Sequence, residues 1–129
     1  MKTLQPAGWA PPVGYSNGVA IGGRQLYVAG QVGWNPITCQ LESDDLVEQV
    51  RQALSNIVAV LKEAGAEPSH LVRLTWFITD KAGYLAARKE IGRAYREVIG
   101  RHFPPMSLLV VAALLEDRAL VEIEATAVF

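Results

Sequence analysis

The apolar stretch at residues 119–128 constrains the fold most, because it carries two glutamates two positions apart. Side chains alternate between the two faces along a β-strand. Glu122 and Glu124 therefore share one face of the predicted strand, and Val121 and Ile123 share the other. The alternation alone favours a glutamate face that is open to water. If another part of the protein encloses that face, a carboxylate there can bind a water or move a proton.

A second apolar run, at residues 106–115, precedes this strand. Pro104 and Pro105 come directly before it, and proline is tolerated at the start of a strand but not in its middle. The strand is therefore predicted to begin at about Met106. The charged residues 116–118 follow the run as a turn, so the two apolar runs are predicted to form a hairpin.

The first half of the chain contains two strand-like runs and one helical pattern. Residues 19–21 and 25–29 flank Gly22 and Gly23, and this spacing predicts a tight hairpin. From residue 43 or 44 to residue 64, apolar side chains recur at three- and four-residue steps, which predicts a helix.

A further strand and a second helix follow. Residues 71–79 are rich in β-branched and aromatic side chains, which favours a strand. Four of its side chains share one face: Arg73, Thr75, Phe77 and Thr79. The pattern then predicts a helix over residues 83–99, preceded by Asp80 as its cap. The predicted order of elements is β-β-α-β-α-β-β.

Size and charge limit the classes of function. A chain of 129 residues is expected to form one domain, residues 1–129, with a core of its own. Twelve basic and 13 acidic residues leave a net charge of −1, so neither nucleic acid nor anionic lipid is an expected partner. No apolar run reaches the roughly 18 residues of a membrane span, and no signal-peptide pattern opens the chain. We therefore expect a cytoplasmic protein without a membrane partner.

Half of the residues are hydrophobic and the mean hydropathy is +0.18, which indicates apolar surface buried between subunits. Cys39 is the only cysteine and lies in a turn-like stretch, so it is interpreted as a passive thiol. His70 and His102 stand in no ligand spacing such as His-x-x-x-His, and no metal site is expected.

These elements, in this order, and the short motifs within them resemble the Rid family, the reactive intermediate deaminases that are also called YjgF-type proteins. The resemblance covers nearly the whole chain, and its specificity comes from the order and spacing of the motifs rather than from any one of them. The motifs are Gly14-Tyr15-Ser16, Val28-Ala29-Gly30-Gln31, Gln52-Ala53-Leu54-Ser55-Asn56-Ile57, Ala64-Gly65-Ala66, Pro104-Pro105-Met106-Ser107 and Val121-Glu122-Ile123-Glu124-Ala125.

The resemblance implies an α+β fold with two helices on one face of a mostly antiparallel sheet, assembled into a chorismate-mutase-like homotrimer. It implies small-molecule clefts between adjacent subunits, and hydrolysis of enamines and imines to 2-keto acids and ammonia without metal or organic cofactor. In such proteins an arginine after the proline pair binds the substrate carboxylate. The glutamate that matches Glu122 orients water.

Three positions depart from the pattern of the active family members. Met106 stands where the arginine would be, Leu108 where a cysteine often follows, and Ala29 where a serine is frequent. Methionine cannot pair with a carboxylate, and losing a charged clamp weakens the binding of a small 2-imino acid by several kcal/mol. The resemblance is therefore to the arginine-lacking subgroup, and weak or no activity on simple 2-imino acids is expected.

The candidate site contains Glu122 as the catalytic group, with a cleft shaped by Tyr15, Met106, Ser107 and Leu108. Arg88 is a candidate substitute clamp, but a four-residue shift of the alignment puts Gly92 at the same place, and Arg88 also fits an exposed helix charge. Tyr15 fits equally as a ligand contact and as a packed ring. Arg73 either serves the site or pairs with the glutamates.

Two classes of function follow from this site. The first is a Rid-like hydrolase of an enamine, an imine or a related small metabolite, in a cleft between subunits. The second is a non-catalytic trimer that binds a small molecule or another protein. Endoribonuclease activity is disfavoured by the near-neutral charge and by the lack of a basic constellation.

Overall fold

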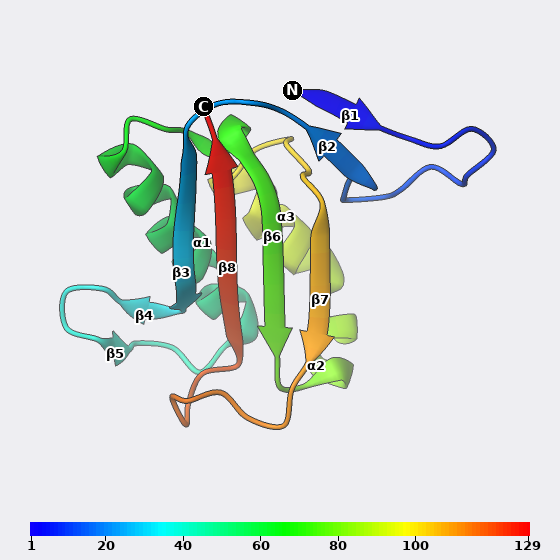
Figure 1. Ribbon diagram of the computed structural model, residues 1–129. Coiled ribbons are helices and arrows are strands. Elements are labelled where there is room, and N and C mark those ends of the chain that lie inside the picture. Colours follow the sequence, from blue (N-terminus) through cyan, green and yellow to red (C-terminus); the bar gives the residue numbers. More distant parts are fainter.

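A four-stranded sheet with helices on one face forms the body of the computed structural model, which describes residues 1–129 (Figure 1). Its strand order is β3-β8-β6-β7, formed by β3 (Gln25–Val32), β8 (Val121–Val128), β6 (Leu71–Ile78) and β7 (Met106–Val110). β8 is antiparallel to both of its neighbours, and β6 and β7 are parallel. The predicted α+β fold with a mostly antiparallel sheet is confirmed.

The helix layer consists of α1 (Leu46–Glu63), α2 (Lys81–Ala86) and α3 (Arg88–Val98). The Asp45 side chain caps α1 by accepting the Glu48 backbone N–H at 3.0 Å. The helix predicted over residues 83–99 is instead two helices. Ala87 separates them because its backbone, at φ −101° and ψ 8°, lies outside the helical region. None of the helices combines the length and apolar character that crossing a membrane requires.

The hairpin predicted between residues 106–115 and 119–128 is wrong. β7 pairs with β6 in parallel, and α2 and α3 provide the crossover that parallel neighbours need. This pairing places Met106 beside Leu74, and Met106 packs against the core between the sheet and the helices. After β7, residues 111–120 pass the end of β6 and enter β8 on its other side (Figure 1).

The hairpin predicted around Gly22 and Gly23 is also wrong. β2 (Gly18–Ala20) pairs with β1 (Lys2–Leu4), and the two form an arm beside the sheet (Figure 1). β3 pairs instead with β8, and Arg24 and Phe129 exchange two backbone hydrogen bonds of 2.8 and 3.0 Å where the strands meet. The glycines therefore connect the arm to the sheet.

Three short elements complete the chain. β4 (Trp34–Asn35) and β5 (Gln40–Leu41) form a small ribbon, and Cys39 lies in its turn at a left-handed φ of 56°. The 3₁₀ helix η1 (Pro68–His70) leads into β6. Cys39 is exposed and unpaired.

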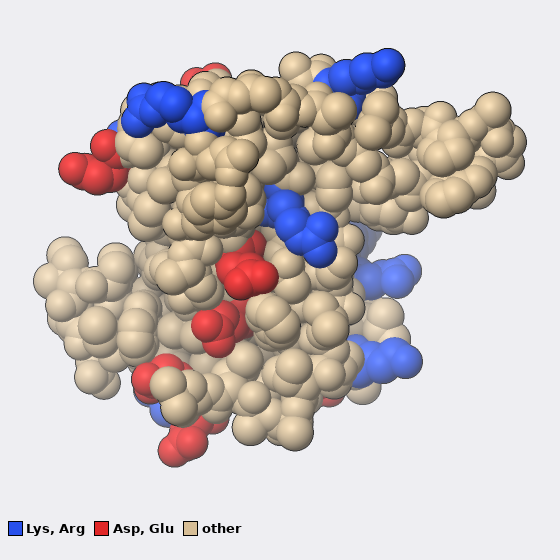
Figure 2. Space-filling view, in the orientation of Figure 1, with Lys and Arg blue, Asp and Glu red and all other residues tan.

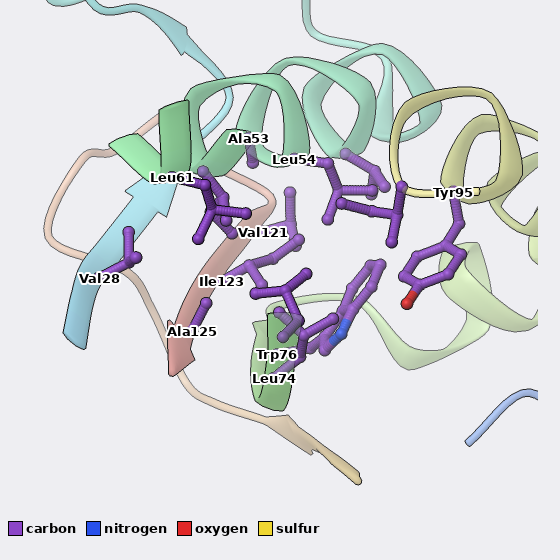
Figure 3. Packing of buried hydrophobic residues seen from close by; sticks show 14 of the residues in the cluster. Val28, Ala53, Leu54, Leu61, Leu74, Trp76, Tyr95, Val121, Ile123 and Ala125 are labelled. Carbon is purple, nitrogen blue, oxygen red and sulfur yellow. The ribbon is translucent and has the colours of Figure 1, made fainter. Parts of the chain in front are cut away.

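One hydrophobic cluster of 18 buried residues fills the space between the sheet and the helices. Figure 3 shows Leu54 and Leu61 of α1 against Val121 and Ile123 of β8. Full burial of one such leucine stabilises the fold by about 2 kcal/mol. The predicted alternation in residues 119–128 is confirmed, because Val121 and Ile123 are fully buried and Glu122 and Glu124 lie on the opposite face.

Candidate functional site

Glu122 lies on the face of the sheet away from the helices, here called the outer face. It stands opposite Phe77 of β6 on one side and Val32 of β3 on the other. Glu124 is two residues further along β8, opposite Thr75. Figure 2 looks onto this face and shows acidic side chains at its centre with a basic one close by. The strand alternation therefore places both carboxylates in the middle of an open sheet surface.

The Glu122 carboxylate rests on Gly30. The β3–β8 pairing shifts register between Val28 and Gln31, which is a β-bulge. A Cβ added at Gly30 would overlap the Glu122 carboxylate, with the Cδ atom of Glu122 only 2.9 Å away. The absence of a side chain at Gly30 therefore leaves the space that the Glu122 carboxylate occupies. Glu122 is partly buried and makes no hydrogen bond or ion pair with another side chain, so its oxygens can accept from a bound water.

β7 divides its three candidate residues between the two faces. Met106 pairs with Leu74 and Leu108 pairs with Trp76, so both point toward the helix side of the sheet. Ser107 pairs with Thr75 and points to the outer face. Met106 packs partly against the core, and Leu108 is 38% exposed. Within one chain, only Ser107 of these three shares a face with Glu122.

Two apolar side chains that the sequence did not assign to the candidate site stand in the same row as Glu122. Phe77 of β6 lies directly opposite it, and Leu109 of β7 pairs with Phe77. Leu109 is 46% exposed and Phe77 is partly buried. The parallel register of β7 is the signal that identifies Leu109, and the sequence alone did not reveal that register. The immediate surroundings of Glu122 are therefore more apolar than its own strand indicates.

Tyr15 and Arg88 approach the sheet from other directions. Tyr15 is 44% exposed. Its neighbour Ser16 donates from its backbone N–H to the Pro104 carbonyl at 3.3 Å and from Oγ to the Phe103 carbonyl at 2.7 Å. These bonds hold Tyr15 beside the start of β7.

Arg88 begins α3, in the helix layer, and is exposed. Burial raises the pKa of the neighbouring Tyr84 hydroxyl, against the opposing effect of the Arg88 charge. The structure therefore does not bring Arg88 to the face that carries Glu122. No group of three or more histidine, cysteine, aspartate or glutamate side chains is arranged to hold a metal ion.

Comparison with known proteins places this chain in a family. Residues 7–129 match the family model described as Endoribonuclease L-PSP. The RutC family protein PM1466 of Pasteurella multocida is 36% identical over 106 residues, which cover 82% of this chain and 81% of that protein. The 2-iminobutanoate/2-iminopropanoate deaminase of Capra hircus is 35% identical over 114 residues, 88% of this chain and 79% of that protein.

The fold agrees with these relatives. The crystal structure of YyfB from Yersinia pestis, a protein of unknown function of the conserved Rid protein family, superimposes with a TM-score of 0.84. It is 36% identical, and the match covers 99% of this chain and 98% of that chain. The protein therefore belongs to the Rid/YjgF family, the family of the Endoribonuclease L-PSP model.

Proposed function

We propose that the protein is a cytoplasmic Rid-like hydrolase that acts on an enamine, an imine or a related small metabolite in a cleft between subunits. The observation that carries the proposal is Glu122, held over Gly30 at the centre of the outer face with its oxygens free of side-chain partners. Relatives of the chain include proteins named as 2-iminobutanoate/2-iminopropanoate deaminases, which supports C=N hydrolysis as the reaction class.

In the proposed reaction Glu122 accepts a hydrogen bond from a water and directs its oxygen at the C=N carbon. As the C–O bond forms, the carboxylate accepts one proton from the water, and the nitrogen takes up the electron pair of the C=N bond. The protonated carboxyl returns this proton to the nitrogen, which gives a carbinolamine with a hydroxyl and an amino group on the same carbon. Glu122 then accepts the hydroxyl proton and passes it to the amino nitrogen, so that the C=O bond forms as the C–N bond breaks. One imine and one water give one carbonyl compound and one ammonia, and no metal or organic cofactor is required.

The lining of the proposed cleft favours a substrate less polar than a simple 2-imino acid. Phe77 and Leu109 flank Glu122 on the outer face. Met106 and Leu108, on the helix side of the β7 edge, can meet a Glu122 only from a neighbouring copy. None of these four side chains can pair with a carboxylate. Simple 2-imino acids are therefore proposed as weak substrates or non-substrates.

The cleft requires an assembly, and we expect a homotrimer of about 42 kDa, three times the 14.0 kDa chain. The outer face carries no helix and exposes large side chains, among them Tyr27 at 71% and Leu109 at 46%. A closed threefold assembly covers such a face without leaving a repeating free surface. Light scattering at micromolar concentration measures the mass directly. A stable monomer would remove the cleft and the proposed function with it.

Replacing Met106 with arginine is expected to increase hydrolysis of 2-iminobutanoate, because the substitution restores the clamp that the resemblance places at this position. A bidentate arginine pairs with the substrate carboxylate, and such a contact contributes about 2 kcal/mol, or roughly a 30-fold increase in kcat/KM. The assay generates the imine in solution and follows its loss against a reaction without protein. Met106→Gln, a polar residue without charge, is the matched control. A folded trimer of Met106→Arg with no gain contradicts this role.

The second candidate is a non-catalytic trimer that binds a small molecule. The core packing of Met106 favours it, because the position of the clamp is filled by an apolar side chain that contributes to stability. A panel of imines and enamines separates the two candidates. Turnover of any member supports the hydrolase, and saturable binding without turnover across the panel supports the binder.

A further inference from the structure

One flank of α3 lies beside the edge of the sheet that β7 forms. The buried Tyr95 ring of α3 stacks on Phe103 at a centroid distance of 5.5 Å. The Tyr95 hydroxyl donates to the His102 carbonyl at 2.5 Å. Both contacts are made with the segment that leads into β7. Tyr95 therefore marks the flank of α3 that faces this edge.

Arg88 and Gly92 occupy the same flank of α3. They precede Tyr95 by seven and three positions, and residues at these spacings share one face of an α-helix. A different flank faces α1, where Glu97 pairs with Arg51. The chain reverses direction between α3 and β7, so the beginning of α3 lies near the end of β7 (Figure 1). Figure 2 shows basic side chains that project past this edge of the sheet.

The missing side chain at Gly92 leaves space for an arginine. Arg96 folds back along the helix, and its Nη1 atom lies 3.3 Å from the place where a Cβ of residue 92 would stand. Arg88 precedes Gly92 by four residues, which is about 6 Å along the helix axis. Neither Arg88 nor Arg96 takes part in an ion pair or a side-chain hydrogen bond.

An anion between the two arginines would stabilise both. Like charges one turn apart on a helix repel each other. Arg88 also stands at the beginning of α3, where the positive end of the helix dipole opposes a cation. This flank belongs to the helix layer and not to the outer face that the proposed assembly covers.

An apolar strip separates the arginines from the site of the proposed reaction. Leu108 and Val110 point to the helix side of β7 and are 38% and 51% exposed. They are two residues apart, which is about 7 Å along the strand. In the proposed assembly Leu108 meets Glu122 of a neighbouring copy. Val110 lies at the end of β7, toward the beginning of α3.

We propose that Arg88 and Arg96 bind the anionic end of a substrate whose C=N carbon is separated from that anion by about five bonds of apolar chain. The inference rests on the proposed function, because Glu122 of a neighbouring copy acts on the other end of the substrate. A carboxylate suits the site, since a guanidinium pairs with it in a bidentate way. About five bonds of about 1.5 Å each span the strip of 7 Å.

The same spacing separates this substrate class from the simple 2-imino acids. In a 2-imino acid one bond joins the carboxylate to the C=N carbon, so a carboxylate at that distance lies beside Met106 and Leu108 and not beside the arginines. The proposed substrate instead places methylene groups against the apolar strip.

The test uses ketones that correspond to the hydrolysis products, so that binding is measured apart from turnover. 6-Oxoheptanoate has five bonds between its ketone and carboxylate carbons. 2-Heptanone has the same chain with a methyl group in place of the carboxylate, and 2-oxobutanoate has one bond between the two carbons. Calorimetric titration of the native protein at pH 7 is expected to give 6-oxoheptanoate a Kd at least about tenfold lower than either, because only this ligand gains the charge-assisted contact.

Arg88→Gln and Arg96→Gln are each expected to raise the Kd of 6-oxoheptanoate at least about tenfold and to leave that of 2-heptanone unchanged. Gly92→Leu keeps both charges but fills the space of the Arg96 head group, so it is expected to weaken binding of 6-oxoheptanoate as well. The matched control is Arg93→Gln, which removes an exposed arginine of α3 outside this flank and is expected to leave every Kd unchanged.

Three results overturn the proposal. They are a Kd of 6-oxoheptanoate no lower than that of 2-heptanone, an equal loss of binding in Arg93→Gln, and dissociation of the assembly by Arg88→Gln or Arg96→Gln in light scattering. The last result would assign the arginines to contacts between subunits. Imine turnover together with the first result refutes the arginine site and leaves the proposed hydrolysis standing. Tight, arginine-dependent binding of 6-oxoheptanoate without turnover of any imine supports the arginine site and refutes the hydrolysis.

Discussion

Replacing Glu122 with glutamine is expected to lower the rate of C=N hydrolysis by at least about 100-fold. Glutamine keeps the length of the side chain and its place over Gly30. Its amide can hydrogen-bond a water but cannot accept a proton from it at neutral pH. The loss is therefore expected in kcat, with little change in KM and in the thermal unfolding midpoint.

Two controls separate chemistry from general charge loss. Glu124→Gln removes the other carboxylate of the same strand and face, and it is expected to reduce the rate less than Glu122→Gln does. Glu63→Gln removes an exposed charge at the end of α1 and is expected to leave the rate unchanged. If Glu122→Gln hydrolyses the substrate as fast as the native protein at equal thermal stability, the glutamate has a structural role only.

The features that the sequence predicted correctly depend on local periodicity. The two-residue period of residues 119–128 is enough to place Glu122 on the face opposite Val121, whatever strand lies beside it. The three- and four-residue steps of α1 likewise identify its buried side, and Asp45 marks its beginning. These properties belong to one segment and its own geometry. They are therefore readable without knowing the neighbours.

The features that the sequence missed depend on pairing between distant segments. The apolar run after Pro105 fits a hairpin with residues 119–128 as well as a parallel strand beside β6, and only the crossover through α2 and α3 decides between them. The same pairing decides that Met106 faces the helix side while Ser107 faces outward. The residues of the candidate site, which the family resemblance supplied, therefore lie on two faces of the sheet of one chain.

Gln49 shows a second kind of long-range dependence. It is a fully buried polar residue of α1, within a helical pattern that gives no sign of its role. Its Nε2 donates to the carbonyls of Ser43 at 2.9 Å and Arg118 at 3.1 Å, and its Oε1 accepts from the Leu120 N–H at 2.8 Å. These bonds fasten α1 to the segment that enters β8. The partners lie up to 71 residues away in sequence.

Replacing Gly33 with alanine is expected to lower the free energy of unfolding by about 3 kcal/mol, at the upper end of overpacking costs. Gly33 is buried at the end of β3, where the backbone of Gln49 passes. An added Cβ would lie 2.5 Å from the Gln49 Cα atom and 2.7 Å from its Cβ atom. Such contacts involve the helix backbone, so α1 has to move away from the sheet.

This movement would displace Gln49, whose side chain hydrogen-bonds Arg118 and Leu120 just before β8, the strand that carries Glu122. Urea unfolding at fixed protein concentration measures the effect, because the stability of an assembly depends on concentration. Gly22→Ala is the matched control: its Cβ meets no atom within 4 Å, and a change below about 1 kcal/mol is expected. Equal urea midpoints for Gly33→Ala and Gly22→Ala would contradict this prediction. In that case the close contact between Gly33 and Gln49 does not contribute to holding α1 and β8 in place.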